Sequence, residues 1–289
     1  MLLGEELSEQ VYQTEHINNV LSVIQKQFPK YFRSFSKNAE DLFNSAIQQH
    51  EKEKVRYQEY LDLETLEEYD VDPNAFKKDT RTKCPIIHRC LMSQDEVMQE
   101  YKKSFNSVVG RDLYVTIYNI AVFGHNYVDS FKPKRHESAK TFEDLRLEDL
   151  SDEDYTCLGV VGFGIQSSLL YGLYPHAFAH RSQNSVWALY FLSERKDFGL
   201  GEAGSEFLMV RPQYGTCEQN YNYPPELFSY YALQIYLMLK SADPSYSKLF
   251  NDEYRYIYLD VFFDHVANKH REDINALKWT SEHVENHWH

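Results

Sequence analysis

Cysteine is scarce in this sequence of 289 residues, which holds four: Cys84, Cys90, Cys157 and Cys217. So few thiols cannot form the disulfide framework that stabilises small secreted domains, and a chain of this length does not need one. The first ten residues turn acidic at once, so they lack the pattern of a targeting segment. We therefore expect a soluble, intracellular, cytoplasmic protein with reduced thiols.

Long apolar runs are also missing. The only apolar stretch near membrane length spans residues 158–174, and Gln166, Ser167 and Ser168 interrupt it. It falls short of the roughly 20 residues that a spanning helix needs. The sequence therefore predicts that no part of the chain crosses a membrane.

Basic residues are outnumbered, with 30 Lys and Arg against 44 Asp and Glu and a net charge of −14. The summed field of such a chain repels polyanions, which disfavours a nucleic-acid partner. Tyrosine is abundant by contrast, with 23 residues, and it suits both core edges and partner surfaces. The partner that we expect is a basic protein or a second copy of this chain.

Residues 155–193 hold one formal charge, Arg181, although 26% of the whole chain is charged. Such a stretch would expose a large apolar patch unless it is buried. We expect a buried helical hairpin that bends at Pro175, with the other helices packed around it. Glycine costs roughly 1 kcal/mol against alanine in a helix. Gly159, Gly162 and Gly164 therefore predict that another backbone packs closely against the first half of the hairpin.

Hydrophobic periodicity predicts a mainly α, multi-helix globular fold with minor β content near 206–211. The first expected helix, 5–28, ends at Pro29. The others span 38–69, 97–110 (after a capping box at Ser93 and Glu96), 113–122, 226–240 and 254–270. The β-branched content of residues 113–122 suits a strand as well, and we favour the helix. The Asp, Pro and Asn content of residues 72–89 predicts a loop. The charged segment 132–153 is predicted to be a surface linker between an acidic helical region, 1–131, and a core helical region, 154–289, unless the two form one continuous domain.

His176 and His180 form the first candidate site. On a helix their i, i+4 spacing places two imidazoles on one face, which suits zinc or another divalent metal. Glu202 or Glu206 could add a third ligand or a general base, and Arg181 could stabilise developing negative charge. If Arg181 is buried, it needs a carboxylate or a bound anion. This set predicts a metal-dependent hydrolase, in one form a nuclease or phosphodiesterase.

Two further sets could hold a metal. Cys84, His88 and Cys90 are three soft ligands close together, and a structural zinc could be completed by Cys157 or Cys217. Their spacing differs from paired C-x2-C knuckles, and separate buried thiols are the alternative. Asp260 and Asp264 lie i, i+4 near His265 and His270, which suits a divalent cation or, equally, a solvent-facing helix.

Two basic segments stand out against the acidic background. Residues 77–89 and 132–135 contain Lys77, Lys78, Arg81, Lys83, Lys132, Lys134 and Arg135. Local positive charge of this kind could contact phosphate groups. An ordinary charged surface has the same composition.

Functions of different classes fit these observations. We favour a binding or regulatory protein that acts through an acidic, tyrosine-rich surface on a macromolecular partner. The alternatives are the metal-dependent hydrolase centred on His176, His180 and Arg181, and nucleic-acid contact through 77–89 and 132–135. The sequence alone leaves open whether the protein is an enzyme.

Overall fold

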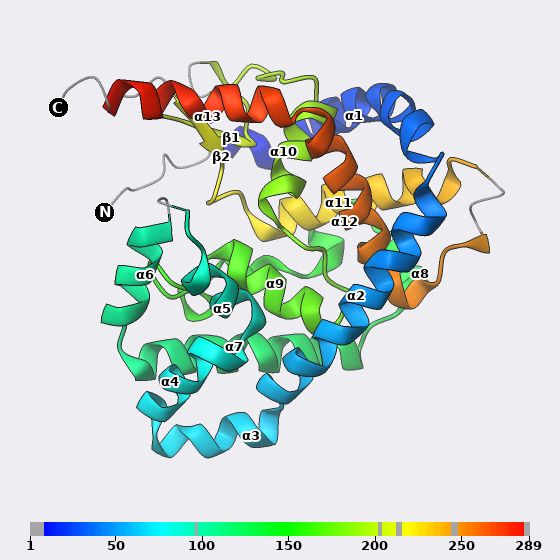
Figure 1. Cartoon of the computed structure of the whole chain (residues 1–289). Coiled ribbons are helices and arrows are strands. Elements are labelled where there is room, and N and C mark those ends of the chain that lie inside the picture. The colour runs from blue at the N-terminus through cyan, green and yellow to red at the C-terminus, as the bar shows by residue number, and fades with distance from the viewer. Residues whose placement is uncertain (1–8, 96–97, 202–203, 212–215, 244–247, 286–289) are drawn as a thin grey trace.

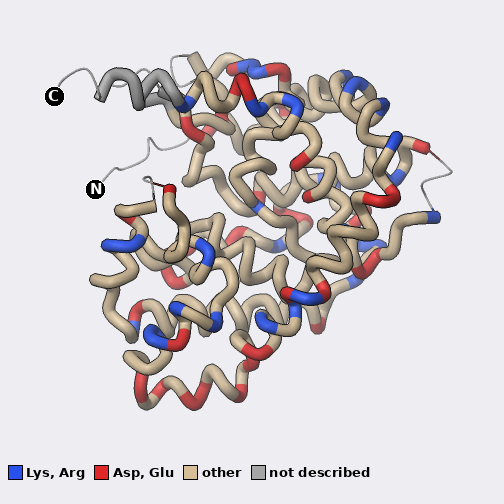
Figure 2. Tube along the Cα trace, viewed as in Figure 1, with Lys and Arg blue, Asp and Glu red and all other residues tan. Residues whose placement is uncertain are grey.

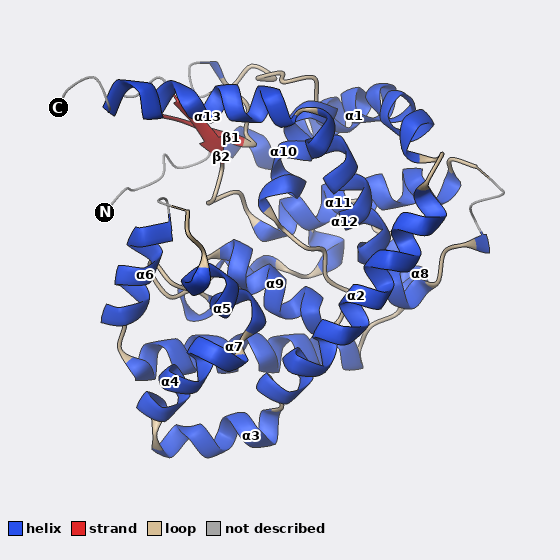
Figure 3. Ribbon diagram, in the orientation of Figure 1, coloured by secondary structure: helices blue, strands red, loops and turns tan. Residues whose placement is uncertain are grey.

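Helices form most of the structure, which confirms the predicted mainly α fold (Figure 3). The computed structural model describes residues 9–95, 98–201, 204–211, 216–243 and 248–285. In chain order the α-helices are α1 (Thr14–Phe35), α2 (Ala39–Tyr60), α3 (Leu63–Glu68), α4 (Pro73–Lys83), α5 (Pro85–Met92), α6 (Met98–Ser107), α7 (Gly110–Asp129), α8 (Pro133–Glu137), α9 (Phe163–Leu173), α10 (Gln183–Leu192), α11 (Pro225–Ser241), α12 (Arg255–Lys269) and α13 (Arg271–Glu285). Short 3-10 helices include η1 (Glu9–Tyr12), η2 (Tyr69–Val71), η3 (Glu143–Leu145), η4 (Glu148–Ser151), η5 (Glu153–Tyr155) and η8 (Asp252–Tyr254).

Most of the low-charge stretch is buried, as the sequence predicts, but it does not form the predicted helical hairpin. Its helices, α9 and α10, are joined by residues 174–182 and pack on other helices rather than along each other. α10 is buried from Ser185 to Leu192. α12 packs along α10, and α2 packs on both α9 and α12. α2 crosses the molecule diagonally, from the end of α1 to α3 (Figure 1). This arrangement brings side chains of α2, α9 and α12 together beside the connection between α9 and α10.

A small antiparallel hairpin is the only sheet in the described part of the chain. Its strands are β1 (Leu208–Arg211) and β2 (Thr216–Gln219), with Leu208 opposite Gln219. They confirm the strand content predicted near 206–211. α13 packs against β2 (Figure 1).

The loop predicted over residues 72–89 is wrong, because α4 and α5 occupy this segment. Each helix begins with a proline at its first turn, where the missing N–H costs no hydrogen bond. The Asp72 carboxylate caps α4 by accepting a hydrogen bond from the Ala75 N–H at 3.0 Å. The Asp-Pro-Asn sequence therefore marks a helix start.

Two other helix boundaries also differ from the prediction. α1 continues through Pro29 to Phe35, with Phe28 and Tyr31 buried on either side of the proline. Packing of this apolar face outweighs the hydrogen bond that Pro29 cannot make. The helix expected over 38–69 is interrupted after α2, and α3 starts at the cap Asp62. Residues 5–8 and Glu96 lie outside the described residues.

The segment 132–153 contains α8 and short 3-10 turns rather than continuous loop. It buries Leu145, Leu147 and Leu150, and its turns pack against α11. The division into two regions at this segment stays a prediction. Among the described residues, no helix is both long enough and apolar enough to cross a membrane. The four cysteines are free.

Among the described residues, no backbone packs closely against Gly159, Gly162 or Gly164 as predicted. A Cβ at Gly162 would meet nothing within 4 Å, and one at Gly164 would lie 3.8 Å from the Arg181 carbonyl oxygen, an ordinary contact distance. Gly159 adopts a positive φ of 73°, which favours glycine, and a Cβ there would lie 2.8 Å from the Ser104 hydroxyl oxygen. Further along α9, a Cβ at Gly172 would lie 2.5 Å from the ring of Tyr57. α2 therefore packs against α9 at Gly172.

We expect Gly172→Ala to destabilise the protein by about 1–3 kcal/mol, because the added methyl group displaces the buried Tyr57 ring. Gly164→Ala on the same helix should be neutral or stabilise by up to about 1 kcal/mol, since its methyl group has room. Urea unfolding of both variants measures the difference. Equal effects of the two substitutions would contradict the close contact at Gly172.

Candidate functional site

His176 and His180 lie in the connection between α9 and α10, and the helix that would align them does not form. Residues 175–177 make a turn, and residues 178–182 have no regular secondary structure. The ring of His176 packs edge to face against Phe131 and Tyr174. The ring of His180 instead stacks on Tyr171, with 4.8 Å between ring centroids. The helical geometry on which the metal pair was predicted is therefore absent.

His180 connects α9 to α12 through its two ring nitrogens. Nδ1 lies 3.1 Å from Asp260 Oδ2 on α12, and Nε2 lies 3.2 Å from Ser168 Oγ on α9. The side chains of His180 and Asp260 are each 21% exposed, whereas Ser168 is only 4% exposed. Solvent therefore reaches the histidine and the carboxylate but hardly reaches the serine.

The hydrogen bonds of Ser168 indicate where the protons of His180 lie. Ser168 Oγ is 2.8 Å from the Gly164 carbonyl oxygen, to which its O–H donates. The same oxygen must then accept a hydrogen bond from His180 Nε2–H. The Asp260 carboxylate accepts a second hydrogen bond, which the Nδ1–H of His180 donates. His180 therefore carries both ring protons and a positive charge in this arrangement.

The charges around His180 favour the same state. Burial disfavours the charged ring, but the negative charge of Asp260 and its hydrogen bond outweigh burial and raise the pKa of His180 above its usual 6.5. Asp264, one turn further along α12, also favours the charged ring, and Arg89 opposes it. The pKa of Asp264 is raised, first by burial and then by the charge of Asp260.

His50 of α2 lies beside this group. Its ring packs edge to face on Tyr171, with 5.3 Å between ring centroids, and its Nε2 is buried without a hydrogen-bond partner. Burial and the charge of Lys54 lower the pKa of His50 to about 4. Neighbouring groups with pKa values shifted in opposite directions are typical of acid–base sites. We define the His180 cluster as His50, Ser168, Tyr171, His180, Asp260 and Asp264.

Sequence reasoning finds only part of this cluster. It assigns His180 and the two aspartates to separate candidate sites, and it assigns Ser168 and His50 to none. One signal for Ser168 is present, because the polar residues 166–168 interrupt a stretch that must be buried and so need partners there.

The histidines predicted beside Asp260 face elsewhere. His265 Nε2 lies 3.0 Å from Ser34 Oγ, and His270 lies 2.9 Å from the Tyr31 hydroxyl and 2.8 Å from Asp273. These side chains connect α12 and its C-terminal end to α1 and α13.

Arg181 contacts a different part of the molecule from His180. Its guanidinium donates to the Asn220 carbonyl oxygen, and its Nε is buried without a partner. Burial lowers the pKa of Arg181 to about 10, and the groups that favour its charge are Tyr223 and Tyr221. Among the described residues, the carboxylate expected beside a buried Arg181 is not found.

Glu206 is buried beside α1 rather than beside His180. One carboxylate oxygen contacts the His16 ring, and the other accepts a hydrogen bond from the Tyr223 hydroxyl at 2.8 Å. Glu202 lies outside the described residues. The side chains of Arg181 and Glu206 therefore do not join His180 in one site.

The Cys84, His88 and Cys90 side chains also have separate environments. Cys84 is fully buried, and burial raises the pKa of its thiol to about 12. His88 Nδ1 instead lies 3.0 Å from the Arg81 carbonyl oxygen. Within the residues that the structure describes, no three His, Cys, Asp or Glu side chains are grouped closely enough to hold a metal ion.

Most basic side chains of residues 77–89 contact the chain itself. Lys77 donates to the carbonyl oxygens of Asn106 and Val108, Arg81 to the Asn106 side chain, Lys83 to Asp79 and Arg89 to Glu53. Lys132, Lys134 and Arg135 are exposed on and beside α8. Figure 2 shows lysines and arginines dispersed among acidic residues. A continuous basic surface, which phosphate recognition favours, does not result.

The described surface is acidic but not rich in tyrosine. Tyr12 and Tyr221 are its only exposed tyrosines, whereas Tyr231 and Tyr236 are fully buried. Aromatic packing in the core therefore accounts for most of the tyrosine excess. Negative charge is concentrated in residues 57–76, which contain no Lys or Arg (Figure 2). The acidic residues of this segment are Glu59, Asp62, Glu64, Glu67, Glu68, Asp70 and Asp72.

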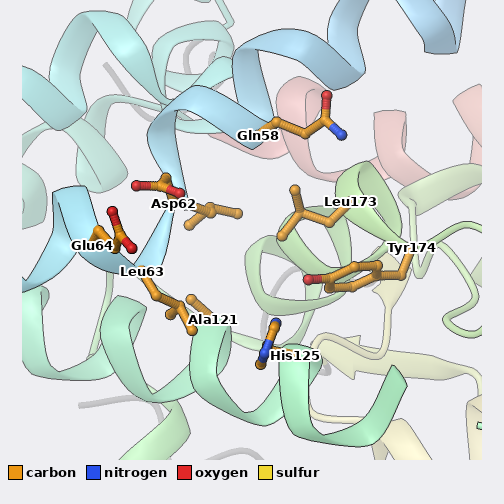
Figure 4. Close-up of a pocket in the computed structure, with 9 residues that line it drawn as sticks. Gln58, Asp62, Leu63, Glu64, Ala121, His125, Leu173 and Tyr174 are labelled. Atoms are coloured by element: carbon orange, nitrogen blue, oxygen red, sulfur yellow. The ribbon is translucent and has the colours of Figure 1, made fainter. Parts of the chain in front are cut away.

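A cavity of about 360 Å³ opens beside this acidic segment, between α2, α3, α7 and the end of α9 (Figure 4). Its lining is Gln58, Leu61, Asp62, Leu63, Glu64, Ala121, His125, Leu173 and Tyr174. In Figure 4 the Tyr174 hydroxyl points into the space, and Asp62 and Glu64 lie together on the opposite side. We call this space the α3 cavity. Its lining does not include the His180 cluster.

No family model matches the sequence, and no curated protein or solved structure matches it. Proposals about function therefore rest on the side chains described above.

The His180–Asp260 pair should make stability depend on pH. Because the folded-state pKa of His180 is raised, the stabilisation is complete below about pH 6.5 and is lost as pH rises through the folded-state value. We expect Asp260→Asn to cost about 1.5–3 kcal/mol at pH 6 and clearly less at pH 9. Urea unfolding of wild type and variant at both pH values measures this.

The matched control is Asp129→Asn. This substitution removes the carboxylate of an exposed histidine–aspartate pair, in which Asp129 lies 3.5 Å from His125. It should lower the free energy of unfolding by less than about 1 kcal/mol at either pH. An Asp260→Asn effect that does not change between the two pH values would contradict a charged His180.

Proposed function

We propose that the protein is a binding protein whose α3 cavity accepts a lysine or arginine side chain of a basic protein partner. The observation that carries this proposal is a cavity lined by leucines and by the carboxylates Asp62 and Glu64, beside a segment without basic residues. The proposal narrows the acidic binding surface expected from the sequence to one position on the molecule.

The size and lining of the cavity suit one long cationic side chain. Its volume lies at the lower end of the range for ligand sites, roughly 300–1,000 Å³. The apolar stem of a lysine or arginine would pack on Leu61, Leu63 and Leu173. Its charged end would remain near Asp62 and Glu64, as long basic side chains prefer.

The polar groups beside the cavity are in the right charge states. The Asp62 carboxylate accepts hydrogen bonds from the Thr65 N–H and hydroxyl at 2.9 and 2.8 Å. These bonds lower the pKa of Asp62, so it is charged at neutral pH. Burial raises the pKa of Tyr174, so its hydroxyl is protonated there. The ring of Tyr174 adds an aromatic face that attracts cations.

The charge of the whole chain supports the same partner. A net charge of −14 attracts a basic protein at long range and increases its association rate at low salt. We therefore expect binding that weakens as ionic strength rises, because surface charges are screened beyond about 8–10 Å.

The geometry favours this function over the two alternatives. The side chains proposed for a metal-dependent hydrolase, His176, His180 and Arg181, have different neighbours. Of the basic side chains proposed for nucleic-acid contact, Lys77, Arg81 and Lys83 are engaged within the chain. The exposed ones are dispersed among acidic residues (Figure 2). The α3 cavity, in contrast, is open and has the charge that a basic partner requires.

The test uses charge reversal inside and outside the cavity. Glu64→Lys should weaken binding of a fluorescent lysine-rich peptide about tenfold or more, because it places a like charge beside the bound side chain. Glu68→Lys makes the same change on the same helix at an exposed position that does not line the cavity. It should weaken binding only slightly, through the long-range field. Fluorescence anisotropy measures both affinities.

Equal losses in the two variants would show that the peptide responds to net charge alone and would contradict the cavity as its site. Failure of the wild-type protein to bind at low salt would contradict the proposed function altogether.

A further inference from the structure

We propose that Ser168 is a nucleophile that His180 and Asp260 activate, and that it takes an acyl group from a carboxylic ester or a similarly reactive electrophile. The proposal is independent of the α3 cavity. It rests on one chain of hydrogen bonds, from Ser168 Oγ to His180 Nε2 at 3.2 Å and from His180 Nδ1 to Asp260 Oδ2 at 3.1 Å. A hydroxyl, an imidazole and a carboxylate in this order are the parts of a serine nucleophile and its base.

The two ends of this chain are held by packed helices. Ser168 lies on α9, Asp260 lies on α12, and α2 packs against both helices. The Tyr171 ring stacks parallel to His180 at 13° and fixes the plane of the imidazole. The order of the three groups therefore follows from the fold, and no loop movement is needed to assemble them.

The nucleophile is switched off while His180 is charged. In that state the Ser168 hydroxyl donates to the Gly164 carbonyl oxygen at 2.8 Å and accepts from His180 Nε2–H. When His180 loses its Nε2 proton, that nitrogen becomes an acceptor, and the hydroxyl can turn from Gly164 to donate to it. Nδ1–H remains bonded to Asp260 throughout. Loss of the Nε2 proton therefore turns His180 from a cation paired with Asp260 into a neutral base that can accept the Ser168 proton.

The groups facing His180 set the pH of this change. They are Asp260 and Asp264 on α12, Tyr171 on α9, His50 on α2 and Arg89 on α5. The two aspartates favour the charged ring, and Arg89 opposes it. His50 is neutral near pH 7 and adds no charge there. The nucleophile should therefore become active as pH rises through the folded-state pKa of His180, which is raised above its usual 6.5.

The reaction step balances without a cofactor. Ser168 Oγ bonds to the ester carbonyl carbon, and its proton passes to His180 Nε2. The carbon–oxygen bond to the alcohol then breaks, and His180 returns the proton to the leaving alcohol. Water then attacks the acyl carbon and gives a proton to His180 Nε2. The bond from that carbon to Ser168 Oγ breaks, the acid leaves, and His180 returns the proton to the serine.

The position of Ser168 predicts a slow reaction. It lies inside α9, where the neighbouring backbone N–H groups are used within the helix and do not form an oxyanion hole. Loss of one oxyanion donor alone slows such reactions by about 10²–10³-fold. The serine is also 4% exposed, so small electrophiles should reach it first. We therefore expect covalent modification of Ser168 rather than rapid turnover.

Methanesulfonyl fluoride, a small serine-reactive compound, is the probe. Its sulfur forms a bond to Ser168 Oγ, fluoride leaves, and the serine proton passes to His180. Mass spectrometry of the intact and digested protein should show one modification, at Ser168. Its rate should rise about tenfold per pH unit and level off above the pKa of His180. Asp260→Asn should slow it about tenfold or more.

Ser167 provides a matched control on the same helix. Its hydroxyl donates to the same Gly164 carbonyl oxygen, at 3.0 Å, but accepts from the Arg181 backbone N–H instead of an imidazole. Ser167→Ala should leave the modification intact, and Ser168→Ala should abolish it, with both variants folded by circular dichroism. Modification that persists in Ser168→Ala would overturn the proposal. So would an unmodified wild-type protein over the range from about pH 6 to about pH 9.

Discussion

Burial of the charge-poor segment that contains α9 and α10 is the constraint on which the rest of the structure depends. The segment is apolar enough to require burial, yet it removes Ser168, Arg181 and most of His180 from solvent. Polar groups removed from water need partners, and charged groups need them most. α12 provides Asp260 for His180, and Asn220, the residue after β2, provides its carbonyl oxygen for Arg181. The contacts around this segment thus follow from a few polar side chains as well as from apolar packing.

The two cations of this segment, His180 and Arg181, are stabilised in different ways. His180 faces two carboxylates of α12, which favour its charge, and remains in contact with solvent. Arg181 lies deeper, and a backbone carbonyl and tyrosines surround it in place of a carboxylate. A guanidinium keeps its charge in such a setting because its pKa is so high, whereas an imidazole needs a carboxylate. The neighbouring positions 180 and 181 therefore have different physical roles, one titratable and one permanently charged.

α9 connects the two proposed sites. Ser168 and Tyr171 belong to the His180 cluster, and Leu173 and Tyr174, at the other end of the helix, line the α3 cavity. Gly172 lies between them and lets Tyr57 of α2 approach closely. One short helix therefore contributes side chains to both proposed sites.

Much of the fold could be predicted from local sequence, and much of the site could not. The charge-poor stretch and the apolar periodicity indicate the buried helices α9, α10, α11 and α12, because burial imposes those patterns directly. They do not indicate that α9 and α10 pack on other helices rather than on each other. Asp72 and Pro73 led to the wrong prediction of a loop, because aspartate and proline are common both in loops and at the first turn of a helix. Sequence spacing favours pairing His180 with His176, but the chain turns between them, and the partner of His180 comes from α12. Contacts between side chains of different helices depend on how the helices pack, and the spacing of residues along the sequence does not predict that packing.

The most direct test of this account is an NMR titration of the His180 ring in the folded protein. The account predicts that His180 titrates above its usual pKa of 6.5 and that Asp260→Asn moves the transition toward lower pH. A ring that titrates below 6.5, or one that Asp260→Asn leaves unchanged, would contradict the charged pair and, with it, the proposed control of Ser168.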